Sequence, residues 1–417
     1  MKIKALKGFK DIVPDEIELW NFIDKTARSV FERFNFSEIR MPILEATELF
    51  ARSIGETTDI VEKEMYTFPD KKITMRPEAT ASMLRAYIEN GLYAKKPVQR
   101  LFTIGPMFRH ERPQKGRLRQ FHQLDVEVLG SENSLVDAEL MAMGALFFNE
   151  LGIDVSLELN SLGCPECRPG YRKILIDYIT TRLDNLCSDC KRRAHTNPLR
   201  VLDCKVPGCR EQIKSAPSVQ DHLCQGCRTH FDNVQKGLEM LNIEYSLNKF
   251  MVRGLDYYCK TTFEFITGDL GAQSAVAAGG RYDGLIEELG GPKNSPGIGF
   301  AMGVERIVLL LQQQKSVLES AEIDLYIAGI GEPGALSGYR LAHQLRKEGW
   351  SVAMDHEGKS LKSQMKQADK ANARYTLIIG ESELEKGKGL LRDMKNRDAE
   401  QVDVELSATA IVNRLQQ

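Results

Sequence analysis

One segment of this 417-residue chain constrains its fold more than any other: two strand-like runs, 98–110 and 119–129, are joined by a polar loop. This arrangement predicts an antiparallel hairpin with a long functional loop. Along the second run, apolar and polar side chains alternate with a period of two, which places Gln123, Asp125 and Glu127 on one face. Such a face suits the floor of a polar pocket, and it also suits a sheet face covered by water.

Helices are expected before and after the hairpin. Apolar residues recur at helical spacing in 15–36, and further helices are expected at 79–90 and 133–151. A strand interrupted or edged by Pro42 follows the first helix, and strand-like, glycine-rich segments resume at 250–303. The larger part of the chain therefore combines helices with a sheet.

The last part of the chain has a different pattern. Within 323–417, short strands and helices alternate, which predicts a small α/β domain with a largely parallel sheet. Residues 315–322 are expected to be the linker that precedes it.

Charge and hydropathy exclude few classes of protein. The net charge is −2, but a nucleic-acid partner needs only local basic surfaces, which the sum hides. No stretch approaches the ~20 apolar residues of a membrane helix. No long apolar run follows the N-terminal lysines, so a signal peptide is not expected either. We expect a cytoplasmic protein without membrane association.

Basic residues gather around the hairpin loop. A guanidinium offers a planar fork of donors that suits phosphate oxygens. A single arginine at a strand end is usually surface charge, whereas five basic residues within eleven positions favour contact with a nucleotide or a nucleic acid. These residues are Arg109, Arg112, Lys115, Arg117 and Arg119.

Three later segments are each ambiguous when taken alone. Residues 252–258 are typical of a turn before core aromatic residues. The paired glycines in 278–285 either let the backbone approach a ligand closely or simply form a turn. Residues 299–306 predict a strand that runs into a helix with an arginine in its first turns.

Together and in this order, these segments resemble the class II aminoacyl-tRNA synthetases. The hairpin is similar to motif 2, residues 299–306 to motif 3, and the strand around Pro42 to motif 1, the dimer-forming element. Two segments, 253–258 and 278–283, resemble those specific to histidyl-tRNA synthetases of the bacterial type. The resemblance covers essentially the whole chain, and its last block is similar to the family's anticodon-binding domain.

The resemblance implies an α+β fold: an antiparallel sheet of six strands flanked by helices, with a small inserted domain and a C-terminal α/β domain. The first part of the catalytic domain, with motifs 1 and 2, is expected at 1–160, and a Cys-rich insertion at 161–245. The second part, with motif 3, is expected at 246–320 and the anticodon-binding domain at 323–417. A homodimer is also implied.

The resemblance further implies a reaction and its partners. The chain would activate histidine with ATP to histidyl-adenylate and pyrophosphate, and then transfer histidine to the 3′ end of its tRNA. Arg109 would hold the α-phosphate and Arg306 the γ-phosphate end, with Glu111 also in the ATP site and Mg²⁺ bridging the phosphates. Arg253 would lie near the reacting carboxylate, where other class II enzymes hold a metal.

Six residues are implied to bind histidine: Glu78, Thr80, Gln123, Glu127, Tyr257 and Tyr258. The first three would accept the α-ammonium, while Glu127 and Tyr258 would bond the two imidazole nitrogens. Gln123 and Glu127 lie about 13 Å apart along a strand, so their side chains must converge on a ligand that lies along it. In isolation, Glu78 also fits an acid that the helix dipole favours at a helix start.

Two basic features are implied to contact tRNA. The hairpin loop, 112–119, would reach the acceptor stem. Four lysines on the expected helix 359–372 either line tRNA phosphates or form a solvated helix face. They are Lys359, Lys362, Lys366 and Lys370.

The cysteines are unevenly placed, since eight of the nine lie between 164 and 227. They form four close pairs: Cys164 with Cys167, Cys187 with Cys190, Cys204 with Cys209, and Cys224 with Cys227. This spacing is typical of two Cys₄ sites for structural Zn²⁺, or of one site with two pairs left over. Free thiols in a packed insertion are the alternative, and the resemblance does not decide because many histidyl-tRNA synthetases lack these cysteines. Cys259 is expected in a pocket wall.

Three other functions compete with the main interpretation. A synthetase-like regulatory subunit of histidine biosynthesis binds histidine without charging tRNA, but the intact Arg109, Arg253 and Arg306 and the block 323–417 argue against it. The segment 253–258 argues against a sibling enzyme of threonyl or prolyl type. An RNA-binding protein without catalysis would not need the phosphate-binding arginines together with the polar strand face.

Overall fold

The computed structural model describes residues 3–54, 58, 60–253, 255, 257–268, 275–314, 323–396 and 400–416. The expected linker lies outside these residues, as do Gly254 and Asp256 of the 253–258 segment. The chain forms two compact units, Met1–Lys315 and Ser316–Gln417, which we describe separately. In the described part of the chain, no helix has the length and apolar character needed to span a bilayer.

The predicted hairpin is confirmed: β5 (Gln99–Phe108) and β6 (Gln120–Leu129) pair antiparallel along their whole length. They belong to an eight-stranded sheet in which the six inner strands are antiparallel and both edge strands are parallel to their neighbours. The sheet runs β1 (Ser37–Glu38), β5, β6, β11 (Gly297–Gly303), β10 (Ala275–Arg281), β9 (Cys259–Ile266), β7 (Ser156–Ser161), β8 (Tyr245–Leu247). The six antiparallel strands that the resemblance implies are therefore confirmed, and two short parallel strands extend the sheet at its edges to eight strands among the described residues.

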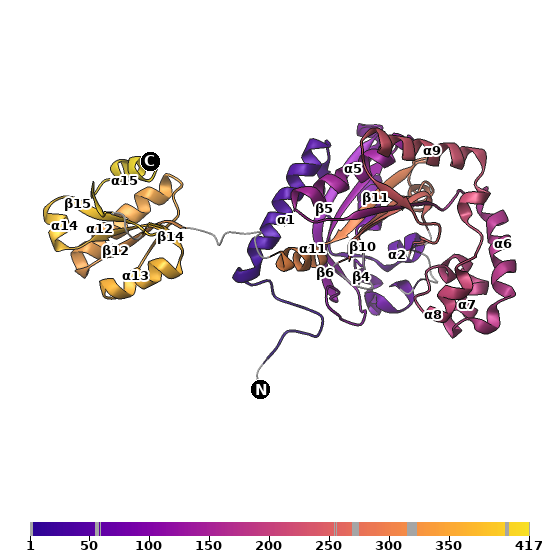
Figure 1. Cartoon of the computed structure of the whole chain (residues 1–417), viewed down its shortest axis with the longest axis horizontal. Helices are drawn as coiled ribbons and strands as arrows, with labels where there is room; N and C mark the ends of the chain where they lie inside the picture. Colours follow the sequence, from indigo (N-terminus) through magenta and orange to yellow (C-terminus); the bar gives the residue numbers. More distant parts are fainter. Residues whose placement is uncertain are drawn as a thin grey trace. The chain divides into compact units, whose positions relative to one another are not determined.

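The apolar face of β6 is the back of the sheet. Val126 lies opposite Phe300 of β11, and both are buried. Helix α5 (Ser134–Glu150) covers this face, with the Phe148 ring 5.4 Å from the Phe265 ring of β9. Helices α1 (Pro14–Arg33) and α9 (Gln225–Met240) pack against α5 (Figure 1).

The expected strand around Pro42 is broken in two. Residues 39–43 form no strand between β1 and β2 (Leu44–Ala46), since proline cannot donate to a sheet ladder. The other elements near the sheet are α2 (Thr47–Ile54), β3 (Tyr66–Phe68), β4 (Ile73–Met75), α3 (Thr80–Glu89), α4 (Leu92–Lys95), α10 (Leu285–Glu288) and α11 (Val304–Gln313).

The Cys-rich stretch folds around its own apolar cluster, which includes Tyr171, Leu175 and Val201. Its helices gather at the side of the first unit away from α1 (Figure 1). They are α6 (Arg168–Thr180), α7 (Ser188–Thr196) and α8 (Pro207–Ile213).

The second unit contains a five-stranded sheet in the order β13-β12-β14-β15-β16. The first three strands are parallel, as predicted, but β15 and β16 pair antiparallel, so the sheet is mixed and not largely parallel. Its elements are β12 (Ile323–Gly329), α12 (Gly331–Lys347), β13 (Val352–Met354), α13 (Leu361–Lys370), β14 (Ala373–Ile379), α14 (Glu381–Glu385), β15 (Lys388–Asp393), β16 (Val402–Glu405) and α15 (Ala408–Leu415).

Candidate active site

On the polar face of β6, Asp125 and Glu127 are buried and Gln123 is partly buried, so this is not an ordinary solvated sheet face. Across the β6–β11 pairing, Gln123 lies opposite Gly303, Asp125 opposite Ala301 and Glu127 opposite Gly299. Each of these three polar residues thus lies opposite a glycine or an alanine. This pairing leaves space above the sheet for a ligand.

A cavity of about 300 Å³ occupies part of that space. Four of the predicted site residues line it together: Arg109, Glu111, Gln123 and Arg306. The oxygen of the Gln123 side chain is buried and has no hydrogen-bond partner among the described residues. A buried amide without a partner is costly unless a ligand satisfies it.

Two arginines enter the cavity from different elements. Arg109, at the end of β5, donates from Nε to the Pro77 carbonyl at 2.7 Å, and its guanidinium lies 5.2 Å from the centre of the Phe121 ring. Arg306 lies in the first turn of α11. Burial lowers the pKa of Arg306, and the positive charge of nearby Arg117 lowers it further. An anion in the cavity would offset the repulsion between these two guanidinium groups.

The carboxyl group of Glu127 is held between two hydroxyls. Thr80 Oγ1 donates to one oxygen at 2.7 Å, and the Tyr282 hydroxyl donates to the other. Burial raises the pKa of Glu127 to about 8, although both hydrogen bonds lower it and nearby Glu78 raises it. Burial therefore favours the protonated form of Glu127 more than it does for an exposed glutamate.

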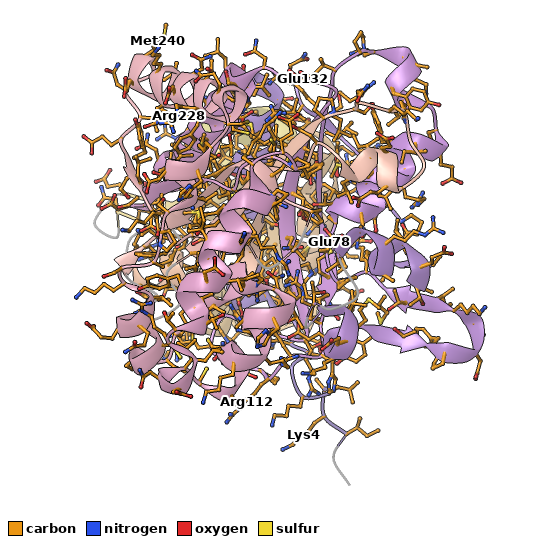
Figure 2. All side chains as sticks on the ribbon, turned by 90° about the vertical axis from the view of Figure 1, so that its right-hand side faces the viewer. Lys4, Glu78, Arg112, Glu132, Arg228 and Met240 are labelled. Carbon is orange, nitrogen blue, oxygen red and sulfur yellow. The ribbon has the colours of Figure 1, made fainter. Side chains whose placement is uncertain are left out.

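Glu78 faces the start of α3. Its carboxylate accepts the backbone N–H of Thr80 at 2.8 Å and that of Ala81 at 2.9 Å. Burial raises the pKa of Glu78, while these bonds and the charge of Arg109 lower it. Glu78 thus stabilises the start of α3, which is the alternative role expected for this acid. Figure 2 shows Glu78 within the body of the unit, whereas Met240 at the end of α9 lies at its periphery.

The aromatic wall of the site consists of three tyrosines. The Tyr257 ring lies 4.6 Å from the Tyr258 ring and 5.7 Å from the Tyr282 ring. Arg253 lies over the Tyr258 ring at 5.6 Å and forms an ion pair with Glu264 of β9. The Arg253 Nε is buried without a hydrogen-bond partner among the described residues, as expected for a donor that faces a ligand site.

Sequence reasoning assigned no role to Tyr282 or to Asp125. The sequence feature that could have indicated a role for Tyr282 is its position directly after β10, two residues beyond the paired glycines. Asp125 is buried between Gln123 and Glu127 on the polar face, and burial, with Glu127 and Glu78 nearby, raises its pKa well above the usual range. The polar face therefore carries less negative charge than its sequence indicates.

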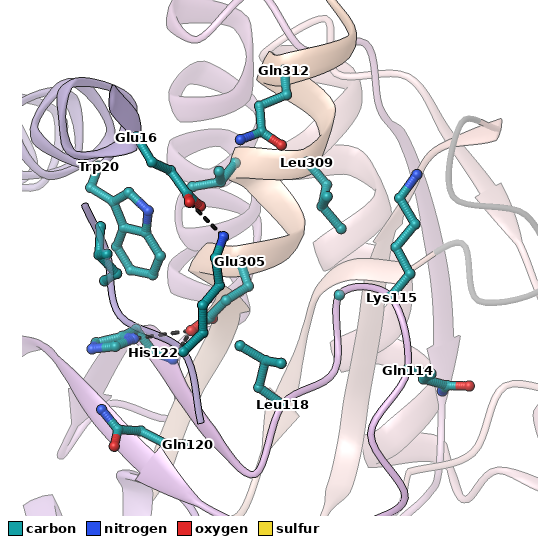
Figure 3. Close-up of a pocket in the computed structure, with 14 residues that line it drawn as sticks. Glu16, Trp20, Gln114, Lys115, Leu118, Gln120, His122, Glu305, Leu309 and Gln312 are labelled. Carbon is teal, nitrogen blue, oxygen red and sulfur yellow. Dashed lines mark hydrogen bonds and ion pairs between the residues drawn. The ribbon is translucent and has the colours of Figure 1, made fainter. Parts of the chain in front are cut away.

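A second hollow, of about 170 Å³, lies between the N-terminal segment, the hairpin loop and α11 (Figure 3). It shares Glu305 with the cavity above the sheet. Glu305 accepts the backbone N–H of His122 at 2.9 Å and bonds its ring nitrogen at 3.0 Å. This bond joins the start of α11, and hence Arg306, to β6. Among the described residues, the lining of this hollow includes Lys10 and Lys115 but no arginine.

The eight predicted metal ligands do not line the cavity above the sheet. They form two groups of four, Cys164, Cys167, Cys224 and Cys227 in one and Cys187, Cys190, Cys204 and Cys209 in the other. Cys259 is buried in β9, where its sulfur accepts the backbone N–H of Asp283 at 3.3 Å.

Comparison with known proteins decides the family. A family model described as histidyl-tRNA synthetase matches residues 8–307, and a model described as anticodon binding domain matches residues 330–414. The chain belongs to the histidyl-tRNA synthetase family. The expected fold class is thereby confirmed together with the C-terminal domain type.

Individual proteins similar to this chain belong to the same family. A histidine–tRNA ligase of Desulfotalea psychrophila is 66% identical over 408 residues, which cover 98% of this chain and 95% of that protein. A histidine–tRNA ligase of Geobacter sulfurreducens is 57% identical and covers 99% of this chain and 100% of its own length. The crystal structure of the apo histidyl-tRNA synthetase of S. aureus matches with a TM-score of 0.83 at 34% identity, over 100% of both chains.

Proposed function

We propose that this chain is a histidine–tRNA ligase, which activates histidine with ATP and then transfers it to the 3′ end of its tRNA. The observation that carries the proposal is the Glu127 carboxyl group, buried between Thr80 and Tyr282 on the strand face that also carries Gln123. That face extends toward the cavity lined by Arg109 and Arg306.

Specificity for histidine follows from the polar groups of this pocket. Glu127 and Tyr258 bond the two imidazole nitrogens, while Glu78, Thr80 and Gln123 receive the α-ammonium. An amino acid without two ring nitrogens leaves buried polar groups unpaired, and mismatches of this kind discriminate by ~10⁴-fold or more. Tyr257 closes the pocket against the Tyr258 ring.

The chemical step needs no enzyme nucleophile. The histidine carboxylate oxygen attacks the α-phosphorus of ATP, a new P–O bond forms, and the bond to the pyrophosphate oxygen breaks. Arg109 and Arg253 stabilise the charge at the α-phosphate, and Arg306 holds the γ-phosphate end. Fixed cations placed where charge develops are the main source of catalysis in such reactions.

The cavity also fits Mg²⁺ carried by the ATP phosphates. This ion usually keeps several waters and takes one or two carboxylates in addition to phosphate oxygens. Glu111 lines the cavity with Arg109 and Arg306, and its carboxylate is held 3.3 Å from Arg117. Glu111 would hold the ion, and the ion would supply neutralisation of the phosphate charge.

The domain roles are part of the proposal. Residues 1–160 and 246–320 form the catalytic domain, 161–245 the Cys-rich insertion, and 323–417 the anticodon-binding domain. The loop 112–119 contacts the acceptor stem, and the lysines around α13 contact tRNA phosphates. These lysines are Lys359, Lys362, Lys366 and Lys370, and all are exposed. The protein acts as a cytoplasmic homodimer without membrane association.

The test is ATP–pyrophosphate exchange with each of the twenty amino acids, repeated with Arg253→Ala. Exchange with histidine alone, abolished by the substitution, supports both the function and the role of Arg253. Histidine binding without any exchange would replace the ligase by the regulatory type of protein. Charging of histidine tRNA by the intact chain then tests the second step.

A further inference from the structure

The eight clustered thiols form two groups whose geometry is that of two separate metal sites. Within each group of four, the sulfur atoms all lie within 4.8 Å of one another. All nine cysteines are free thiols. The groups draw on the cysteine pairs in a nested order: the first and last pairs form the outer group, and the two middle pairs form the inner group.

The distances between sulfur atoms match a tetrahedron around one zinc ion. Four sulfurs at about 2.3 Å from a central Zn²⁺ lie about 3.8 Å from one another. In the outer group, Cys164 lies 3.7 Å from Cys167 and 3.8 Å from Cys224, and Cys167 lies 3.8 Å from Cys227. In the inner group, Cys187 and Cys204 are 3.9 Å apart. An iron–sulfur cluster would need wider spacing, since the iron and sulfide atoms lie between the thiolates.

The backbone around each group favours thiolates. The N–H of Cys164 donates to the Cys167 sulfur at 3.1 Å, and the N–H of Cys187 donates to the Cys209 sulfur at 3.2 Å. Cys167, Cys187 and Cys224 each stand directly before the first residue of a helix, where the helix dipole stabilises negative charge. These are the outer interactions that structural thiolate sites commonly have.

Gly163 makes room for the outer group. It has a φ of +67°, and a Cβ at this position would lie 2.7 Å from the Cys167 sulfur. Position 163 therefore requires glycine for two reasons: the left-handed backbone conformation and the close approach of the Cys167 sulfur.

We propose that the insertion binds two structural Zn²⁺ ions, the outer one through Cys164, Cys167, Cys224 and Cys227 and the inner one through Cys187, Cys190, Cys204 and Cys209. The outer site joins the two chain segments through which the insertion leaves and re-enters the sheet domain, since Cys164 follows β7 and Cys227 lies in α9. The inner site holds α7 and α8 together within the insertion core.

Each site also stands next to an arginine that holds the 253–258 segment. Arg168 directly follows Cys167 and donates to the carbonyls of Tyr258 and Leu162. Arg200 precedes Cys204 by one short turn and donates to the carbonyl of Arg253 at 3.1 Å. The two ions therefore hold in place the arginines that bond the carbonyls of Arg253 and Tyr258.

The first experiment counts metal in the full-length protein, purified without chelators or a metal-binding tag and reconstituted with Zn²⁺. Elemental analysis should find two zinc ions per chain after extensive dialysis. One ion, no ion, or iron in place of zinc overturns the proposal. Substitution with Co²⁺ should give the intense visible bands and thiolate-to-metal charge transfer of a tetrahedral tetrathiolate, at two equivalents.

Paired substitutions test the nested assignment. Cys164→Ser with Cys224→Ser removes two ligands from one site and should leave one zinc ion per chain. Cys164→Ser with Cys187→Ser removes one ligand from each site and should leave none after dialysis against a weak chelator. The reverse result overturns the assignment. Cys259→Ser is the matched control and should retain both ions. The Co²⁺ titration of the unsubstituted protein keeps the proposal falsifiable if a variant does not fold.

Metal counting is independent of the ligase reaction, so either proposal can fail without the other. If both stand, removal of zinc should raise the KM for histidine and lower kcat in ATP–pyrophosphate exchange, each several-fold, because Tyr258 and Arg253 both depend on the arginines beside the two sites. Restored zinc should reverse the change. An unchanged KM in fully depleted, folded protein overturns the link to the 253–258 segment.

Discussion

Glu127 of β6 and Gly299 of β11 lie directly opposite each other, and the carboxylate of Glu127 occupies the space that a Cβ at position 299 would fill. The glycine therefore defines the position of the buried acid. The two residues are 172 positions apart in the chain, and only the pairing of β6 with β11 brings them together.

Gly299→Ala should displace the Glu127 carboxylate from Thr80 and Tyr282. Loss of hydrogen bonds to such a group costs about 1.5–3 kcal/mol, so we expect kcat/KM for histidine to fall by roughly 10- to 100-fold. Steady-state exchange kinetics measure this fall. Gly284→Ala is the control, because a Cβ there meets only an ordinary contact at 3.9 Å. Equal effects of the two substitutions would contradict the relationship.

Tyr282→Phe should remove the hydroxyl that donates to Glu127 and leave the ring packing intact. We expect the KM for histidine to rise by roughly tenfold, with a smaller change in the KM for ATP. Tyr87→Phe provides a comparison, since Tyr87 is buried in the same apolar cluster. If both KM values rise together after Tyr282→Phe, the hydroxyl does not act through the histidine pocket.

The raised pKa of Glu127 predicts a pH dependence of stability. Between its usual pKa of 4.5 and the folded value of about 8, the folded protein holds a proton that the unfolded chain has lost. Its contribution is therefore greatest below pH 4.5 and is lost as the pH rises through about 8. The Tm of the unsubstituted protein should fall relative to that of Glu127→Gln between pH 5 and pH 8. Parallel Tm profiles of the two proteins would show that Glu127 ionises normally.

Arg168→Ala should loosen the 253–258 segment without touching a substrate, because Arg168 bonds only backbone carbonyls of Tyr258 and Leu162 among the contacts described above. Loss of these bonds should raise the KM for histidine by roughly 5- to 10-fold at nearly constant kcat. Arg172→Ala, one turn further along α6, is the matched control. A fall in kcat alone would assign Arg168 a different role.

The sequence was sufficient to predict the hairpin and the long helices α1 and α5, because the alternation of 119–129 and the apolar spacing of 15–36 and 133–151 extend over many residues. The short helices of the Cys-rich stretch, such as α7 and α8, were not predicted. It could not predict the edge strand β8, which is too short to show a period, or the break at Pro42 that leaves only two residues of the expected strand in β1. Tyr282 escaped notice because its partner Glu127 lies on a strand far away in the sequence. The spacing of the cysteines predicted four pairs but not their grouping, since that depends on how α6, α7 and α9 pack.

The nested order of the thiols also has a consequence for the order of events during synthesis. The ribosome delivers the complete inner set, from Cys187 to Cys209, before Cys224 is made. The inner site closes a short stretch of chain, and this in turn shortens the loop that the outer site must close, which lowers its entropic cost. We therefore expect the insertion core to acquire its metal first. The outer site then closes after α9 has formed, before β9, β10 and β11 complete the sheet.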